Sequence, residues 1–136
     1  MATDEDIERI RYGYAAFNSG DLEAFVEYLS DDVELHPVLG ELVGGGDVFR
    51  GPEGAVRWRK VVTSTLDGFH VSVEEIVPAG DGVYVAFVRF HGSGAASGVE
   101  VTLDAANVFT MRDGIVLRMD SYQDRDEALR AVGIER

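Results

Sequence analysis

The chain has 136 residues, 46% of them hydrophobic and 27% charged, which predicts one globular domain over residues 1–136. Acidic residues outnumber Lys and Arg by 25 to 12, and the resulting net charge of −13 disfavours nucleic acid and anionic membranes as partners. The absence of cysteine excludes disulfides, thiolate catalysis and cysteine-ligated metals. An acidic N-terminus without a membrane-length apolar run predicts no signal peptide or membrane anchor, so we expect a cytoplasmic protein.

Two helices are expected at the start of the chain. The first ends at the stop signal of residues 18–20, and its apolar stripe at helical spacing consists of Ile7, Ile10, Tyr14 and Phe17. Asp21 can cap a second, short helix that ends before residues 30–32. The apolar face of this helix is formed by Leu22, Phe25, Val26 and Leu29. The pattern predicts a helical hairpin.

A strand, a glycine-rich segment and a third helix follow. Residues 33–38 alternate between apolar and polar types, which predicts a strand that ends at Pro37. The glycines of residues 39–51 indicate a flexible flap, with a short strand at residues 48–49. Pro52 suits the first turn of a helix. The apolar face of this third helix is Ala55, Trp58, Val62 and Leu66.

The second half of the chain consists mainly of predicted strands, at residues 69–77, 83–90, 99–111 and 115–122. Asp113-Gly114 is typical of a tight hairpin, and successive hairpins predict an antiparallel meander. Asp124 and Glu127 then mark the start of a short terminal helix. Because helices gather early in the chain and strands late, the fold class is α+β rather than parallel α/β.

Three segments carry a resemblance to a known family: residues 14–21 (YAAFNSGD), 49–54 (FRGPEG) and 111–129, which contains MRDGIV, YQD and EAL. The chain resembles the SnoaL-like group of the nuclear transport factor 2-like superfamily, which is related to polyketide cyclases and ketosteroid isomerases. The resemblance implies a cone-shaped, strongly curved mixed or antiparallel sheet wrapped around three helices, with a ligand cavity inside. These motifs specify architecture, and members of the group differ in activity.

Asp120 is the candidate catalytic base. It shares strand parity with Arg118 and Tyr122, and on sequence alone this polar face is expected to lie in water. The resemblance implies instead an aspartate of the late sheet that acts as a base inside the cone, and Asp120 is the nearest positional match. A register slip of one residue would reverse inside and outside. If Asp120 faces inward, Tyr122 lies on the same face and would orient the carboxylate or the substrate.

His36, at the end of the first predicted strand, is the candidate donor that complements this base. A strand-end histidine satisfied by backbone or water is the alternative. His36, His70 and His91 lie in separate segments without metal-ligand spacing, so neither a metal site nor a cofactor is expected.

The candidate substrate-binding residues are mostly aromatic: Tyr14, Phe17, Trp58, Asn107 and Phe109. Asp104 and Asn107 interrupt an apolar strand. Exposure to solvent or at an interface is the favoured interpretation for Asp104, and a bulge near residues 105–106, which would place both residues on one face, is the alternative. Asn107 is the better pocket residue because an amide orients a carbonyl without carrying charge. These residues predict a largely apolar ligand with one or two oxygen atoms.

Two functions remain open from the sequence. The first is a small-molecule pocket protein that performs cofactor-free isomerisation, cyclisation or hydrolysis by carboxylate and histidine acid–base chemistry. The second is a non-catalytic ligand-binding or protein-interaction domain of the same fold. Both faces of the strand at residues 83–90 are largely apolar, which predicts a homodimer through the outer face of the sheet.

Overall fold

The computed structural model describes residues 2–37, 48–94 and 96–134. Its helices are α1 (Ala2–Ser19), α2 (Leu22–Val26), α3 (Gly51–Thr65) and α4 (Arg125–Ala131). Its strands are β1 (Leu29–His36), β2 (Phe49–Arg50), β3 (Leu66–Gly80), β4 (Val83–Gly94), β5 (Glu100–Arg112) and β6 (Ile115–Tyr122). This arrangement confirms the predicted α+β class. Among the described residues, no helix combines the length and the apolar character needed to cross a bilayer.

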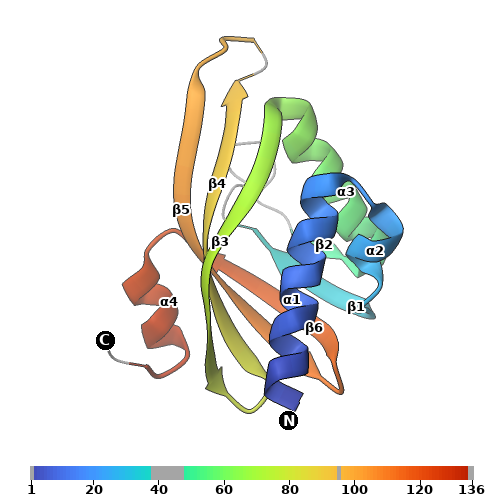
Figure 1. Cartoon of the computed structure of the whole chain (residues 1–136), viewed down its shortest axis with the longest axis vertical. Helices are drawn as coiled ribbons and strands as arrows, with labels where there is room; N and C mark the ends of the chain where they lie inside the picture. Colours follow the sequence, from blue (N-terminus) through green and yellow to red (C-terminus); the bar gives the residue numbers. More distant parts are fainter. Residues whose placement is uncertain (1, 38–47, 95, 135–136) are drawn as a thin grey trace.

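The strands form a mixed sheet in the order β2-β1-β6-β5-β4-β3. Strands β3 to β6 form the predicted antiparallel meander, and β1 joins it by pairing parallel to β6. Helices α1, α2 and α3 lie on one face of the sheet, and α4 lies on the other (Figure 1). The sheet therefore separates two sites of burial, one under α1 to α3 and one under α4.

The predicted caps of the short helices are present. The Asp21 side chain accepts a hydrogen bond from the Ala24 amide at 3.2 Å, and the Asp124 side chain accepts from the amides of Asp126 and Glu127 at 2.8 and 3.3 Å. These contacts satisfy amides that a helix leaves unpaired in its first turn.

Several predicted boundaries are wrong, because strand pairing extends into segments with helical apolar spacing. Leu29 was expected at the end of the second helix, but it begins β1 and pairs with Val116 of β6. Leu66 was expected on the third helix, but it begins β3 and pairs with Gly94. The short strand lies at Phe49–Arg50 rather than at residues 48–49. Residues 39–47 of the expected flap lie outside the described residues.

Helix α1 is fastened to the edge strand β3 by one side chain. Asn18 Nδ2 donates to the carbonyl of Val71, and Asn18 Oδ1 accepts from the Val71 amide, both at 2.8 Å. The Asn18 amide thus substitutes for the neighbouring strand that an edge strand lacks. At the same end of α1, Arg59 Nε of α3 donates to the Phe17 carbonyl at 2.9 Å. These contacts hold α1 and α3 over the sheet.

The outer face of β4 is covered within the chain. Val85 and Phe87 of β4 form a buried cluster with Ala128 and Leu129 of α4. The opposite face of β4, with Tyr84, Ala86, Val88 and Phe90, belongs to the core under α1 to α3. Helix α4 therefore accounts for the second apolar face of β4 without a second copy of the chain. The homodimer stays a prediction, and light scattering would test it.

Candidate functional site

A cavity of about 100 Å³ lies between the helices and the sheet. Its walls come from α1, α2, α3 and the inner faces of β1, β3, β4, β5 and β6, and most are aromatic or aliphatic side chains. An engineered apolar cavity of about 150 Å³ in another protein remains dry and accepts benzene. The cavity can therefore hold a compact apolar group of about the size of one ring.

A chain of three polar side chains interrupts this apolar wall. The Ser121 hydroxyl donates to Asn107 Oδ1 at 2.5 Å, and Asn107 Nδ2 donates to the Tyr14 hydroxyl oxygen at 2.7 Å. Asn107 is only 3% exposed, and all three residues line the cavity. Among the described residues, no acceptor is recorded for the Tyr14 hydroxyl hydrogen. The chain therefore ends in a hydroxyl that can donate to a molecule in the cavity.

The Tyr14 hydroxyl carries its proton at neutral pH, as a phenol ordinarily does. Burial raises the pKa of Tyr14 further above its ordinary value of 10.0, although the Asn107 hydrogen bond opposes the shift. A donor amide on its oxygen polarises the O–H bond, since hydrogen bonds in a chain strengthen one another. Tyr14 is thus a neutral, oriented donor in a site of low polarity. Such a donor suits a ligand carbonyl oxygen or a developing oxyanion.

The structure brings the predicted binding residues together. Tyr14, Phe17, Trp58, Asn107 and Phe109 all line the cavity. The rings of Tyr14 and Phe109 meet edge to face, with centroids 5.8 Å apart and planes at 88°. Phe109 thus packs against the ring that carries the last hydroxyl of the polar chain.

Asp104 and Asn107 lie on opposite faces of β5, so Asp104 is exposed as favoured from the sequence, and the bulge considered as the alternative is not present between them. The pairing of β4 with β5 is regular from Val83↔Thr110 to Ser93↔Glu100, so alternation is kept through residues 105–106. Asp104 therefore points outward, where it accepts from Arg89 Nε at 2.7 Å. The irregularity of β5 lies between Thr110 and Met111, in its pairing with β6.

Asp120 also lies on the outer face of the sheet, in contrast to the inward orientation on which its role as a base depended. It pairs across the sheet with Val108, which belongs to the cluster under α4. The neighbours of Asp120 in β6, Met119 and Ser121, line the cavity instead. Asp120 accepts from Arg118 Nε at 2.8 Å and from Arg118 Nη2 at 3.0 Å. The register decides this outcome, since one residue reverses the face.

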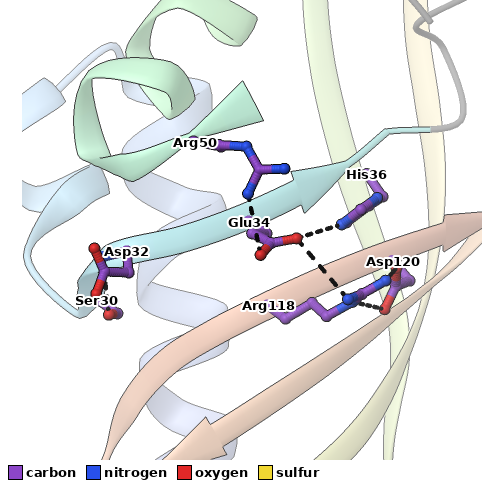
Figure 2. A network of polar contacts seen from close by, with 7 residues as sticks. All are labelled: Ser30, Asp32, Glu34, His36, Arg50, Arg118 and Asp120. Carbon is purple, nitrogen blue, oxygen red and sulfur yellow. Dashed lines mark hydrogen bonds and ion pairs between the residues drawn. The ribbon is translucent and has the colours of Figure 1, made fainter. Parts of the chain in front are cut away.

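His36 belongs to the same outer-face network (Figure 2). His36 Nε2 lies 3.1 Å from Glu34 Oε1, and Arg50 Nη1 lies 3.2 Å from Glu34 Oε2. Arg118 Nη1 approaches Glu34 Oε1 at 3.9 Å. The network joins β2, β1 and β6, and His36 pairs across the strands with Asp120. His36 and Asp120 are thus neighbours, as expected, but neither lines the cavity.

Tyr122 packs against the cluster under α4 and does not line the cavity. The three expected catalytic residues therefore share the outer face. In the described part of the chain, no three His, Asp or Glu side chains are grouped as metal ligands.

The outer-face network makes folding stability depend on pH. The His36 hydrogen bond, helped by the charges of Arg50 and Arg118, lowers the pKa of Glu34, although desolvation acts against the shift. A lowered pKa contributes stability above the unfolded value of about 4.3, and this contribution is lost as pH falls through the folded pKa. We expect the difference in urea midpoint between the original chain and Glu34→Gln to shrink between about pH 6 and pH 3. A difference that stays constant over this range would contradict the prediction.

Ser121 and Arg9 are among the cavity residues that sequence reasoning did not select, and both are polar. Ser121 has the same strand parity as Met119 and lines the cavity with it. A hydroxyl on the otherwise apolar face of this strand was the signal in the sequence that could have identified it. Arg9 precedes Gly13 and Phe17 at spacings of four residues, which places it on the same side of α1 as the aromatic stripe.

Residues 10–119 match the SnoaL-like domain family. This range includes most of the residues that line the cavity. The chain belongs to this family. It is 29% identical to the uncharacterised protein Rv0034 of Mycobacterium tuberculosis over 123 residues, which cover 90% of this chain and 91% of that protein. The match between this SnoaL-like chain and its mycobacterial relative thus extends over nearly the whole length of both.

Solved structures resemble the SnoaL-like chain over nearly its whole length. TerC, co-crystallised with polyporic acid, has a TM-score of 0.77 at 27% identity, with 94% of this chain and 98% of TerC covered. RV0760c of Mycobacterium tuberculosis, in complex with estradiol-17β-hemisuccinate, has a TM-score of 0.72 at 15% identity, with 90% and 95% covered. The second likeness is one of fold alone.

Proposed function

We propose that this chain binds a small, largely apolar molecule through one oxygen atom that accepts a hydrogen bond from Tyr14. The observation that carries the proposal is the Ser121–Asn107–Tyr14 chain, which ends in a hydroxyl on an apolar cavity wall. The cocrystals of TerC with polyporic acid and of RV0760c with estradiol-17β-hemisuccinate support small-molecule binding by proteins of this fold. The cytoplasmic location expected from the sequence stays a prediction.

Binding is supported better than acid–base catalysis by Asp120, His36 and Tyr122. A general base must come within hydrogen-bond reach of the proton that it removes. The described part of the cavity wall contains no carboxylate and no imidazole, and the three candidates lie on the opposite face of the sheet. Isomerisation, cyclisation or hydrolysis by these three residues therefore remains the second hypothesis.

Tyr14→Phe tests the proposal. The variant keeps the ring against Phe109 but removes the hydroxyl, so we expect the dissociation constant of a one-ring aromatic ketone or phenol to rise about tenfold. Trp58 lines the cavity and is the only tryptophan of the chain, so its fluorescence reports binding. Calorimetry gives an independent value for the same probe.

Asp120→Asn is the matched comparison. It removes a charge 2.8 Å from Arg118 on the outer face, so we expect a small loss of stability and unchanged affinity. Equal affinity of Tyr14→Phe and the original chain would refute the role of Tyr14. Loss of turnover of a converted probe in Asp120→Asn, at unchanged affinity, would favour the catalytic hypothesis instead.

A further inference from the structure

A guanidinium lies on the wall of this mostly apolar cavity. Arg9 of α1 lines it, and among the described lining residues Arg9 is the only Lys, Arg, His, Asp or Glu. Arg9 Nη1 donates to the Gly114 carbonyl at 2.9 Å, and the guanidinium carbon lies 4.5 Å from the centre of the Tyr28 ring. One of five N–H donors is thus used by the backbone, and the Tyr28 ring supports the group from one side.

Arg9 is the only described arginine that lines the cavity, and it has no carboxylate partner among the described residues, as is also true of several arginines outside the cavity. Arg50, Arg89, Arg118 and Arg125 each pair with Glu or Asp. The chain has 25 acidic residues for 12 basic ones, so pairing partners are abundant. A cation on an apolar wall costs free energy unless an opposite charge compensates it. An anionic group of a molecule in the cavity would supply the opposite charge that the other lining residues do not give Arg9.

The turn between β5 and β6 fixes the place of this guanidinium. Gly114 has φ of +76°, a backbone conformation that side-chain-bearing residues rarely adopt. A Cβ at Gly114 would overlap Nη1 of Arg9. The glycine thus leaves the space that Arg9 occupies, and its carbonyl holds one end of the group. Arg9 is therefore a positioned cation rather than a freely moving surface side chain.

Arg9 and Tyr14 both line the cavity. The two residues are five positions apart on α1, which corresponds to about 7.5 Å along the helix axis. Gly13 lies between them on the cavity wall, and a Cβ added there would meet no atom within 4 Å. A compact molecule can therefore face both the Tyr14 hydroxyl and the Arg9 guanidinium without displacing a side chain at position 13.

We propose that the ligand is a compact, apolar carboxylic acid whose carboxylate pairs with Arg9 and whose carbonyl or hydroxyl oxygen accepts from Tyr14. This assignment of substrate class rests on the proposed binding function. A guanidinium recognises carboxylates through paired N–H donors. A singly charged carboxylate suits the site better than a doubly charged phosphate, because the apolar wall and the net charge of −13 both penalise a second negative charge.

The test compares acids with uncharged ligands of the same shape. We would titrate the chain at pH 7 with para-hydroxyphenylacetate and para-hydroxyphenylpropanoate, and with the primary amide of each, using calorimetry and Trp58 fluorescence. The original chain should bind each acid about tenfold or more tightly than its amide. Arg9→Gln should remove this preference by weakening the acid and leaving the amide unchanged. Arg11→Gln, which removes the same charge from an exposed position of α1, should keep the preference.

Each outcome is decisive for one of the two proposals. The carboxylate assignment is overturned if the original chain binds acid and amide equally, or if the preference for the acid survives in Arg9→Gln. In either case, amide binding that depends on Tyr14 would still support the proposed function. If neither acids nor amides bind, both proposals fail. Gly13→Leu gives a second readout, since a side chain there should weaken acid and amide alike by filling the space between Arg9 and Tyr14. Unchanged affinities in Gly13→Leu would contradict binding of one molecule to both groups.

Discussion

Replacing Asn107 with Asp should weaken ligand binding roughly 100-fold at pH 7, the largest functional effect that we expect from one substitution. Asn107 now accepts from Ser121 and donates to Tyr14. A carboxylate in its place only accepts, so it would take the hydroxyl hydrogens of both neighbours. The Tyr14 proton would then point away from the cavity, and a negative charge would lie near the ligand oxygen.

The pH dependence of Asn107→Asp makes this prediction specific. Desolvation should raise the pKa of the introduced carboxyl group, because its position is 3% exposed. As pH falls through that pKa the group becomes neutral, so affinity for an uncharged probe should recover in part. Ser121→Ala is the comparison: it removes one donor without adding charge and should have a smaller effect at every pH. Binding by Asn107→Asp equal to that of the original chain would exclude Tyr14 as the donor.

Tyr84→Phe should lower the free energy of unfolding by about 2 kcal/mol, the largest stability effect that we predict. The Tyr84 hydroxyl of β4 donates to Asp6 Oδ2 of α1 at 2.6 Å. Tyr84 is 2% exposed and Asp6 is 6% exposed, so neither group has ready access to water. The variant would leave a buried carboxyl group without this hydrogen bond. Urea denaturation measures the loss.

Tyr12→Phe provides the matched control. The Tyr12 hydroxyl also donates to a carboxylate, Glu27 Oε1, at 3.1 Å, but Tyr12 is 41% exposed. Water can replace this hydrogen bond, so the urea midpoint should hardly change. Equal losses of unfolding free energy in Tyr84→Phe and Tyr12→Phe would show that burial does not determine how much the Tyr84–Asp6 hydrogen bond stabilises the fold. The contrast would be measured in one protein with the same chemical change.

The sequence by itself determined the elements whose signals are local. Helical spacing in α1, the caps Asp21 and Asp124, and the Asp113-Gly114 turn each act within a few residues, so they can be recognised without tertiary information. The aromatic cavity wall follows from the same periodicity, because apolar residues on one side of α1 and α3 must pack against the sheet. Fold class and family resemblance rest on these local patterns.

Only the tertiary structure decided which side chains face the cavity. On β6, Asp120 and Ser121 are adjacent, and the pairing register turned Ser121 inward and Asp120 toward Arg118. On β5, unbroken pairing with β4 separated Asp104 from Asn107. On α1, Arg9 is held at the cavity wall by a hydrogen bond to the carbonyl of Gly114, which is distant in the sequence. Successive residues of a strand point to opposite faces, so the sequence pattern allows either face to be the inner one. Only contacts between segments far apart in the chain decide which face points to the cavity.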